Sequence, residues 1–129
     1  MNESSFTSRL LAALRGDPIL RDGIVWKLSD RFTGGIPDFL VAVRGRVTFW
    51  EVKVNPRKLT KLQAYYINRL FPIAYVIRTD GKRQHWISGD NDAYSFAELV
   101  REVTIRCVSQ QPPPKGDGLF VRTSNASVD

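Results

Sequence analysis

The chain has little cysteine, little histidine and no long hydrophobic run, and each shortage excludes a class of protein. Its single cysteine, Cys107, excludes an intrachain disulfide framework and a multi-cysteine metal site. Its single histidine, His85, argues against Ser-His-Asp or Cys-His catalysis, and we expect it to be a surface or edge residue of a strand. No apolar run approaches the ~18–20 residues of a membrane span, and residues 1–15 do not resemble a secretory signal. We therefore expect a cytoplasmic protein with no membrane partner.

Length and composition fit one domain with a core of its own. The chain has 129 residues, of which 43% are hydrophobic and 25% are charged, so it differs from a disordered chain. We expect a single domain over residues 1–108. The periodic pattern is lost after Ile105, and glutamines and prolines fill residues 110–114. Residues 109–129 are therefore predicted to form a flexible tail that contains proline and serine.

Basic charge is concentrated in the middle of the sequence. The chain carries 19 lysine and arginine residues against 13 aspartate and glutamate residues, for a formal net charge of +6. Residues 41–83 hold ten of the basic residues and two of the acidic ones, whereas residues 1–40 are balanced. A concentrated positive field favours a polyanionic partner, most often nucleic acid, although a basic face that only aids solubility has the same composition.

Hydrophobic periodicity and helix-breaking residues predict three helices and five strands. The helices are expected over residues 3–15, 60–71 and 95–104, and the strands over residues 24–28, 38–43, 46–54, 73–78 and 83–88. The order α-β-β-β-α-β-β-α predicts an α/β fold with a mixed β-sheet flanked by helices. The helix over residues 60–71 is expected to be a crossover, which makes the strands on either side of it parallel.

One predicted strand carries two charges on the same face. Side chains alternate along a strand, so Glu51 and Lys53 share a face while Trp50 lies on the opposite face, where we expect the core. A carboxylate and an ammonium in an otherwise apolar strand are costly to bury unless they are paired or functional.

The hairpin register brings a second carboxylate to this pair. If Arg44–Gly45 is a two-residue turn, Asp38 lies opposite Glu51 on the neighbouring strand. Directly opposed Cβ atoms are ~4.5–5.5 Å apart, so the two carboxylates repel one another unless a cation bridges them. A hard divalent cation such as Mg²⁺ prefers oxygen ligands, and the backbone carbonyl of Val52 can complete the set.

Together these residues resemble the signature of the PD-(D/E)XK nuclease superfamily. The matching segments are Gly35–Leu40, which contains a Pro-Asp pair, Phe49–Lys53, which contains E-x-K, and Leu59–Gln63. They are most similar to the VRR-NUC branch, whose stand-alone members are small phage and bacterial nucleases, and the similarity runs from about Glu3 to Arg78. The resemblance implies a restriction-endonuclease-like fold in a bacterial or phage-infected host cytoplasm.

The resemblance also implies a role for five side chains. Asp38 and Glu51 would hold Mg²⁺, which Mn²⁺ can replace, and Lys53 would orient the attacking water or stabilise charge on the phosphate. Gln63 would lie beside the site, and Glu3 would help to hold the metal, directly or through water. A metal that activates water and polarises a phosphoryl oxygen requires no histidine or cysteine, as this composition demands.

The activity implied is that of a Mg²⁺-dependent DNA endonuclease with no small-molecule substrate. One small domain offers little surface for reading bases, so we expect it to recognise the shape of branched DNA, as Holliday-junction resolvases do. Two symmetric cuts imply a homodimer. The residues expected to bind DNA belong to the basic central segment: Arg44, Arg46, Arg57, Lys58 and Lys61.

Each of these residues also has a simpler structural interpretation. Asp38 can be a turn residue after a proline, and Glu51 and Lys53 can form an exposed ion pair. Gln63 can serve only to close the capping box of its helix, and Glu3 only to complement the helix dipole, although either can also act at a site.

Other functions remain open at this stage. A nicking, flap or exonucleolytic repair enzyme, or a defence nuclease, would use the same catalytic residues on another substrate. A non-catalytic DNA-binding protein could keep the nuclease fold, and an RNA-directed nuclease has neither a supporting motif nor an excluding feature in this sequence.

Overall fold

The computed structural model describes residues 2–28 and 34–109 of the chain. Its elements occur in the predicted order, with one additional 3-10 helix. They are α1 (Glu3–Arg15), the 3-10 helix η1 (Leu20–Asp22), β1 (Ile24–Lys27), β2 (Phe39–Val43), β3 (Arg46–Val54), α2 (Lys61–Leu70), β4 (Ala74–Thr79), β5 (His85–Ile87) and α3 (Phe96–Ser109). The predicted tail from residue 110 onward lies outside the described residues.

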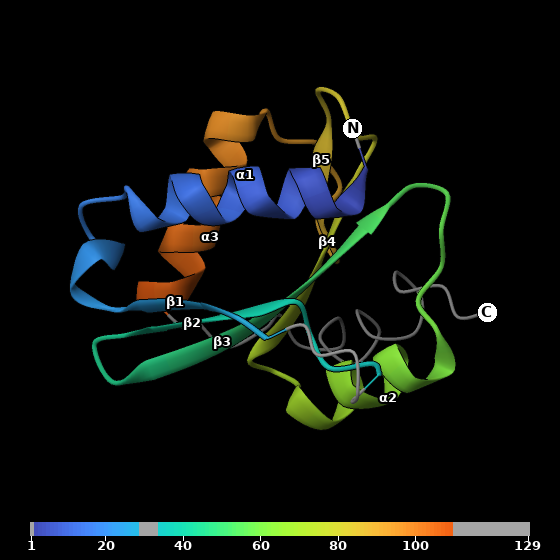
Figure 1. Ribbon diagram of the computed structural model, residues 1–129, viewed down its shortest axis with the longest axis horizontal. Coiled ribbons are helices and arrows are strands. Elements are labelled where there is room, and N and C mark those ends of the chain that lie inside the picture. Colours follow the sequence, from blue (N-terminus) through green and yellow to red (C-terminus); the bar gives the residue numbers. More distant parts are fainter. Residues whose placement is uncertain (1, 29–33, 110–129) are drawn as a thin grey trace.

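The five strands form one mixed sheet in the order β1-β2-β3-β4-β5. The pairs β1–β2, β2–β3 and β4–β5 are antiparallel, and β3–β4 is parallel. The mixed α/β architecture is therefore confirmed, as is the crossover through α2. Because β3 and β4 run in the same direction, their carboxyl ends meet at one edge of the sheet, where the segments following both strands begin (Figure 1).

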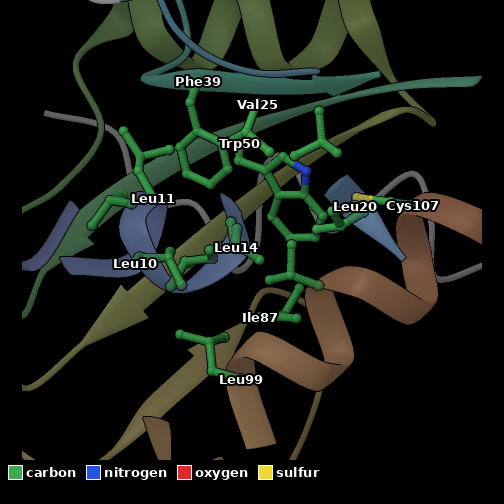
Figure 2. Packing of buried hydrophobic residues seen from close by; sticks show 14 of the residues in the cluster. Leu10, Leu11, Leu14, Leu20, Val25, Phe39, Trp50, Ile87, Leu99 and Cys107 are labelled. Atoms are coloured by element: carbon green, nitrogen blue, oxygen red, sulfur yellow. The ribbon is translucent and has the colours of Figure 1, made fainter. Parts of the chain in front are cut away.

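Helices cover both faces of the sheet, and each face has its own apolar cluster. Helices α1 and α3 pack on the face that carries Trp50 and Val52 of β3, in the larger cluster, as Figure 2 shows for Trp50 among residues of both helices. Helix α2 packs Ala64 and Ile67 on the other face, against Val76 of β4. Even-numbered residues of β3 therefore build the main core, and odd-numbered residues face α2.

Local signals in the sequence set the helix ends. The Asn2 side chain caps α1 by accepting the backbone N–H of Ser5 at 2.8 Å. Thr60 and Gln63 form the capping box of α2, in which each side chain accepts the other residue's backbone N–H. Helix α3 continues to Ser109, five residues past its predicted end, because the main cluster also buries its last turns.

The β2–β3 hairpin has the predicted register. Arg44 and Gly45 both have positive φ angles, of 54° and 76°, as a tight two-residue turn requires. Val43 is paired with Arg46, and the same register continues to the start of β2, where Phe39 is paired with Trp50. Asp38 comes directly before β2 and therefore next to Glu51, as the sequence predicts.

His85 lies in β5, an edge strand of the sheet, as expected, but it is not a surface residue. Its side chain is 1% exposed, because Phe6 of α1 and Phe96 at the start of α3 pack against the imidazole. Its Nδ1 lies 2.7 Å from the Thr79 hydroxyl, and burial lowers its pKa below the ordinary histidine value. Within residues 2–28 and 34–109, no helix is long and apolar enough to cross a membrane.

Candidate active site

Asp38 is fixed at the point where the chain enters β2. Its backbone carbonyl accepts the N–H of Leu28 at 2.8 Å, and its Oδ2 accepts the backbone N–H of Val52 at 2.7 Å. Gly35 brings the preceding segment against α2, since an added Cβ would lie 2.5 Å from Leu62 Cγ and the φ angle of Gly35 is +86°. The carboxylate is thus held against β3 by the backbone rather than exposed at a turn.

Glu51 is buried, and one of its two carboxylate oxygens has no hydrogen-bond partner among the described residues. Its side chain is 1% exposed, and Oε2 accepts a hydrogen bond of 3.3 Å from Gln63 Nε2. Its other oxygen, Oε1, is buried and has no hydrogen-bond partner among the described residues. Buried acceptors are nearly always satisfied, so this atom indicates a ligand or water at the site.

Lys53 completes the charged face of β3. It is 2% exposed, and its charge lowers the pKa of both Asp38 and Glu51, which places it within electrostatic range of both carboxyls. The interpretation of Glu51 and Lys53 as an exposed ion pair is therefore wrong. Trp50 and Val52 point into the main core, which confirms the predicted alternation along β3.

Burial raises the pKa of both carboxyls at this site. Burial raises the pKa of Glu51 to about 9, with a further contribution from the charge of Asp38. Burial also raises the pKa of Asp38, although the hydrogen bond from the Val52 N–H opposes this shift. A cation between the two groups would remove both causes, because it would replace the lost hydration and cancel the repulsion.

The backbone carbonyl of Val52 is a third oxygen at this place. The hairpin register, continued past the start of β2, sets Pro37 opposite Val52. A proline has no N–H, so Pro37 cannot donate the ladder hydrogen bond that this carbonyl would otherwise accept. Two carboxylates and one carbonyl form the all-oxygen donor set that suits Mg²⁺ or Mn²⁺.

Glu3 lies near the site but is bonded elsewhere. Its Oε2 accepts the backbone N–H of Val54 at 3.2 Å and the Arg57 guanidinium at 3.0 Å. Its charge raises the pKa of both Asp38 and Glu51, which places it within electrostatic range. The residues that the structure describes contain no set of three Asp, Glu, His or Cys side chains arranged to hold a metal ion. The donor set at hand therefore consists of two side chains and one carbonyl.

Gln63 does two things at once. Its Oε1 accepts the backbone N–H of Thr60 at 2.9 Å in the capping box, while its Nε2 donates to Glu51. The two interpretations of this residue are therefore compatible, and the amide ties the start of α2 to the carboxylate.

The five predicted DNA-binding residues separate into two groups. Arg57, Lys58 and Lys61 are exposed around the β3–α2 connection, beside the carboxylates. Arg44 and Arg46 lie at the other end of the hairpin, since the five residues from Arg46 to Glu51 span about 17 Å of strand. Arg46 also donates to the carbonyl of Ser109 at 2.8 Å, which gives it a structural contact at the end of α3.

Sequence reasoning missed Arg78. It is paired with Lys53 in the β3–β4 register, and its guanidinium donates to the backbone carbonyl of Arg57 at 2.8 Å and to Asn55 Oδ1 at 3.4 Å. It thus fastens the connection that carries Arg57 and Lys58. The predicted parallel crossover was the signal for this contact, because it brings β4 beside the charged face of β3.

Comparison with known proteins supplies no relative. No family model matches the chain, and neither a curated protein nor a solved structure matches it.

Proposed function

We propose that this chain is a Mg²⁺-dependent nuclease that hydrolyses phosphodiester bonds in DNA. The observation that carries the proposal is the group formed by the half-buried Asp38 with the buried Glu51 and Lys53, in which Glu51 has an unsatisfied oxygen. Two carboxyls whose pKa values are raised and a buried lysine on one strand face are costly for stability. Such a cost is typical of a site kept for its chemistry.

The donor set fits a divalent cation. Asp38, Glu51 and the Val52 carbonyl would hold it, and the unsatisfied Oε1 of Glu51 is the atom that most clearly needs it. When bound, the cation supplies Lewis-acid polarisation of the phosphoryl group and lowers the pKa of a coordinated water.

The remaining roles belong to the chain's own side chains. The Lys53 ammonium is buried beside both carboxylates, where a fixed positive charge stabilises negative charge developing on a phosphate. Gln63 keeps the Glu51 carboxylate oriented through its amide. Arg57, Lys58 and Lys61, at the β3–α2 connection, offer cations to backbone phosphates on that side of the scissile one.

The finer features of the proposal come from the resemblance to PD-(D/E)XK nucleases of the VRR-NUC branch. They are a restriction-endonuclease-like sheet, recognition of branched DNA such as a Holliday junction, and a homodimer that makes paired cuts. The mixed sheet supports the first of these, because Asp38 directly precedes β2, Glu51 lies in the adjacent antiparallel strand β3, and α2 follows β3.

The test is a cleavage assay on four substrates: a labelled four-way junction, a flap, a single strand and a linear duplex. The wild-type protein is compared with Lys53→Ala and with Lys27→Ala, which removes a lysine from the exposed edge strand β1. We expect Mg²⁺-dependent cleavage that EDTA and Lys53→Ala abolish and Lys27→Ala retains. Paired nicks in the junction support the proposal of junction resolution. Cleavage of the other substrates alone supports the nuclease activity but contradicts junction resolution. Binding without cleavage in Mg²⁺ and in Mn²⁺ refutes the enzyme and favours a non-catalytic DNA-binding protein.

A further inference from the structure

The turn between β4 and β5 carries two cations that the site described above does not use. Lys82 and Arg83 are both exposed there, and Asp80 is the single acidic residue of the five-residue connection. A basic surface turn can serve solubility alone. Its shape and its position in the fold point to a more specific role.

Hydrogen bonds fix the backbone of this turn in one shape. Asp80 Oδ1 accepts the backbone N–H groups of residues 82, 83 and 84 at 2.7, 2.9 and 3.1 Å. The N–H of Gly81 donates to the Thr79 hydroxyl at 2.9 Å. The backbone that carries both cations is therefore ordered before any ligand arrives, which reduces the entropy lost on binding.

The same carboxylate keeps these bonds over the neutral pH range. The backbone N–H groups lower the pKa of Asp80 below its ordinary value, so it stays ionised near pH 7. Within residues 2–28 and 34–109, no ion pair joins Asp80 to Lys82 or Arg83.

The parallel pairing of β3 and β4 places this turn at the end of the sheet where the candidate site lies. Lys53 lies beside Arg78 and Val54 beside Thr79, and the turn begins at the next residue. Figure 1 shows the far end of β4 close to the start of α1, whose Glu3 is bonded to the backbone of Val54. Four residues of extended chain separate Arg78 from Lys82, at most about 13 Å.

This position allows contacts with a nucleic-acid strand that passes over Lys53. Successive nucleotides of one strand advance by about 3.4 Å along a duplex, so about 13 Å corresponds to some four nucleotides. Arg57, Lys58 and Lys61 lie at the β3–α2 connection, on the other side of the site. A bound strand would then meet cations on both sides of the carboxylates.

We propose that Lys82 and Arg83 bind backbone phosphates of the strand that passes over Lys53, within some four nucleotides of the scissile phosphate. The inference rests on the proposed function for the nature of its partner, a nucleic-acid backbone. It assigns the turn a binding role that needs no base contact and no metal. Since each neutralised phosphate releases counterions, the role can be measured as a salt dependence.

The experiment measures binding of a labelled four-way junction and a labelled duplex by fluorescence anisotropy from 50 to 200 mM salt. Lys53→Ala is the background, so that Mg²⁺ can be present without cleavage. This background then receives either the turn pair, Lys82→Gln with Arg83→Gln, or the control pair, Arg21→Gln with Arg101→Gln. The control removes the same charge from exposed residues of η1 and α3, to which no binding role is assigned.

We expect the turn pair to weaken binding at least tenfold near 0.1 M salt and to reduce the slope of log K against log salt by about 1.8, or ~0.9 for each lost contact. The control pair should change the slope by much less. Equal slopes for both pairs, or an unchanged slope for the turn pair, overturn the inference. Thermal unfolding of each variant checks that the fold is retained.

Cleavage by the wild-type protein, measured separately, distinguishes the two proposals. If substitution of Lys82 and Arg83 weakens binding but the wild-type protein cleaves nothing, the nuclease proposal is refuted and the role of the turn is supported. If the wild-type protein cleaves DNA but substitution of Lys82 and Arg83 leaves binding unchanged, the role of the turn is refuted and the nuclease proposal is supported. If the wild-type protein binds none of the nucleic acids, both proposals are wrong.

Discussion

Replacing Glu51 by glutamine should make the metal-free protein more stable. The folded chain holds this carboxyl with a pKa of about 9, against an ordinary glutamate value of 4.5. Because the folded pKa is the higher one, the stability contributed by the protonated carboxyl is fully present below pH 4.5 and is lost as the pH rises toward 9. Glutamine cannot ionise, and its amide oxygen can still accept from Gln63.

The size of the effect follows from the two pKa values. At pH 7 the unfolded chain ionises this carboxyl and the folded chain does not, which costs the folded state about 3 kcal/mol. Glu51→Gln removes that cost, and in a domain of this size we expect a rise in Tm of roughly 10 °C. The difference in Tm between the variant and the wild-type protein should vanish near pH 4.5 and increase up to pH 9. Mg²⁺ should reduce this difference, because it stabilises only the wild-type protein.

Thermal and urea unfolding of both proteins in EDTA, from pH 5 to pH 9, measure this gain. Asp92→Asn, which removes an exposed carboxylate, is the matched control and should change Tm by little at any pH. A Glu51→Gln protein that is no more stable than the wild type at pH 8, or a gain that does not vary with pH, would refute the reasoning.

Three further predictions concern other parts of the structure. Asp38→Asn should abolish the rise in Tm that Mg²⁺ gives the wild-type protein, which isothermal titration with Mg²⁺ can confirm independently of any nucleic acid. His85→Gln should flatten the loss of stability below pH 6.5, because burial lowers the pKa of His85 and the unfolded chain binds the proton first; a parallel pH dependence of unfolding in the two proteins would contradict this. Thr60→Ala and Gln63→Ala should each cost about 1 kcal/mol of urea stability through the lost cap. Only Gln63→Ala should also reduce cleavage severalfold, and equal activity in the two variants would show that Gln63 serves the cap alone.

Local rules predict much of this site because they act over few residues. A two-residue turn fixes the hairpin register, and that register together with strand alternation determines that Asp38, Glu51 and Lys53 meet. The capping box of Thr60 and Gln63 is likewise visible in the sequence. No long-range contact is needed for either inference.

The features that sequence reasoning missed all depend on distant segments. His85 is buried because α1 and α3 close over its strand, which no pattern around residue 85 reveals. Helix α3 runs on to Ser109 because the core buries its last turns and the Arg46 guanidinium caps its final carbonyl. The same distant contact shows why a basic residue in a basic segment need not face nucleic acid.

Neighbouring residues of β3 have different roles, because successive side chains point to opposite faces of the sheet. Substitutions at positions 48, 50 and 52 alter the cluster beneath α1 and α3, whereas those at 51 and 53 alter the charged group beside α2. A saturation library scored once for abundance and once for cleavage should therefore show two out-of-phase profiles along this strand. Positions 51 and 53 should be tolerant in abundance and intolerant in activity. In this nine-residue strand, different positions therefore determine stability and activity. A substitution can alter one of these properties while the other is retained.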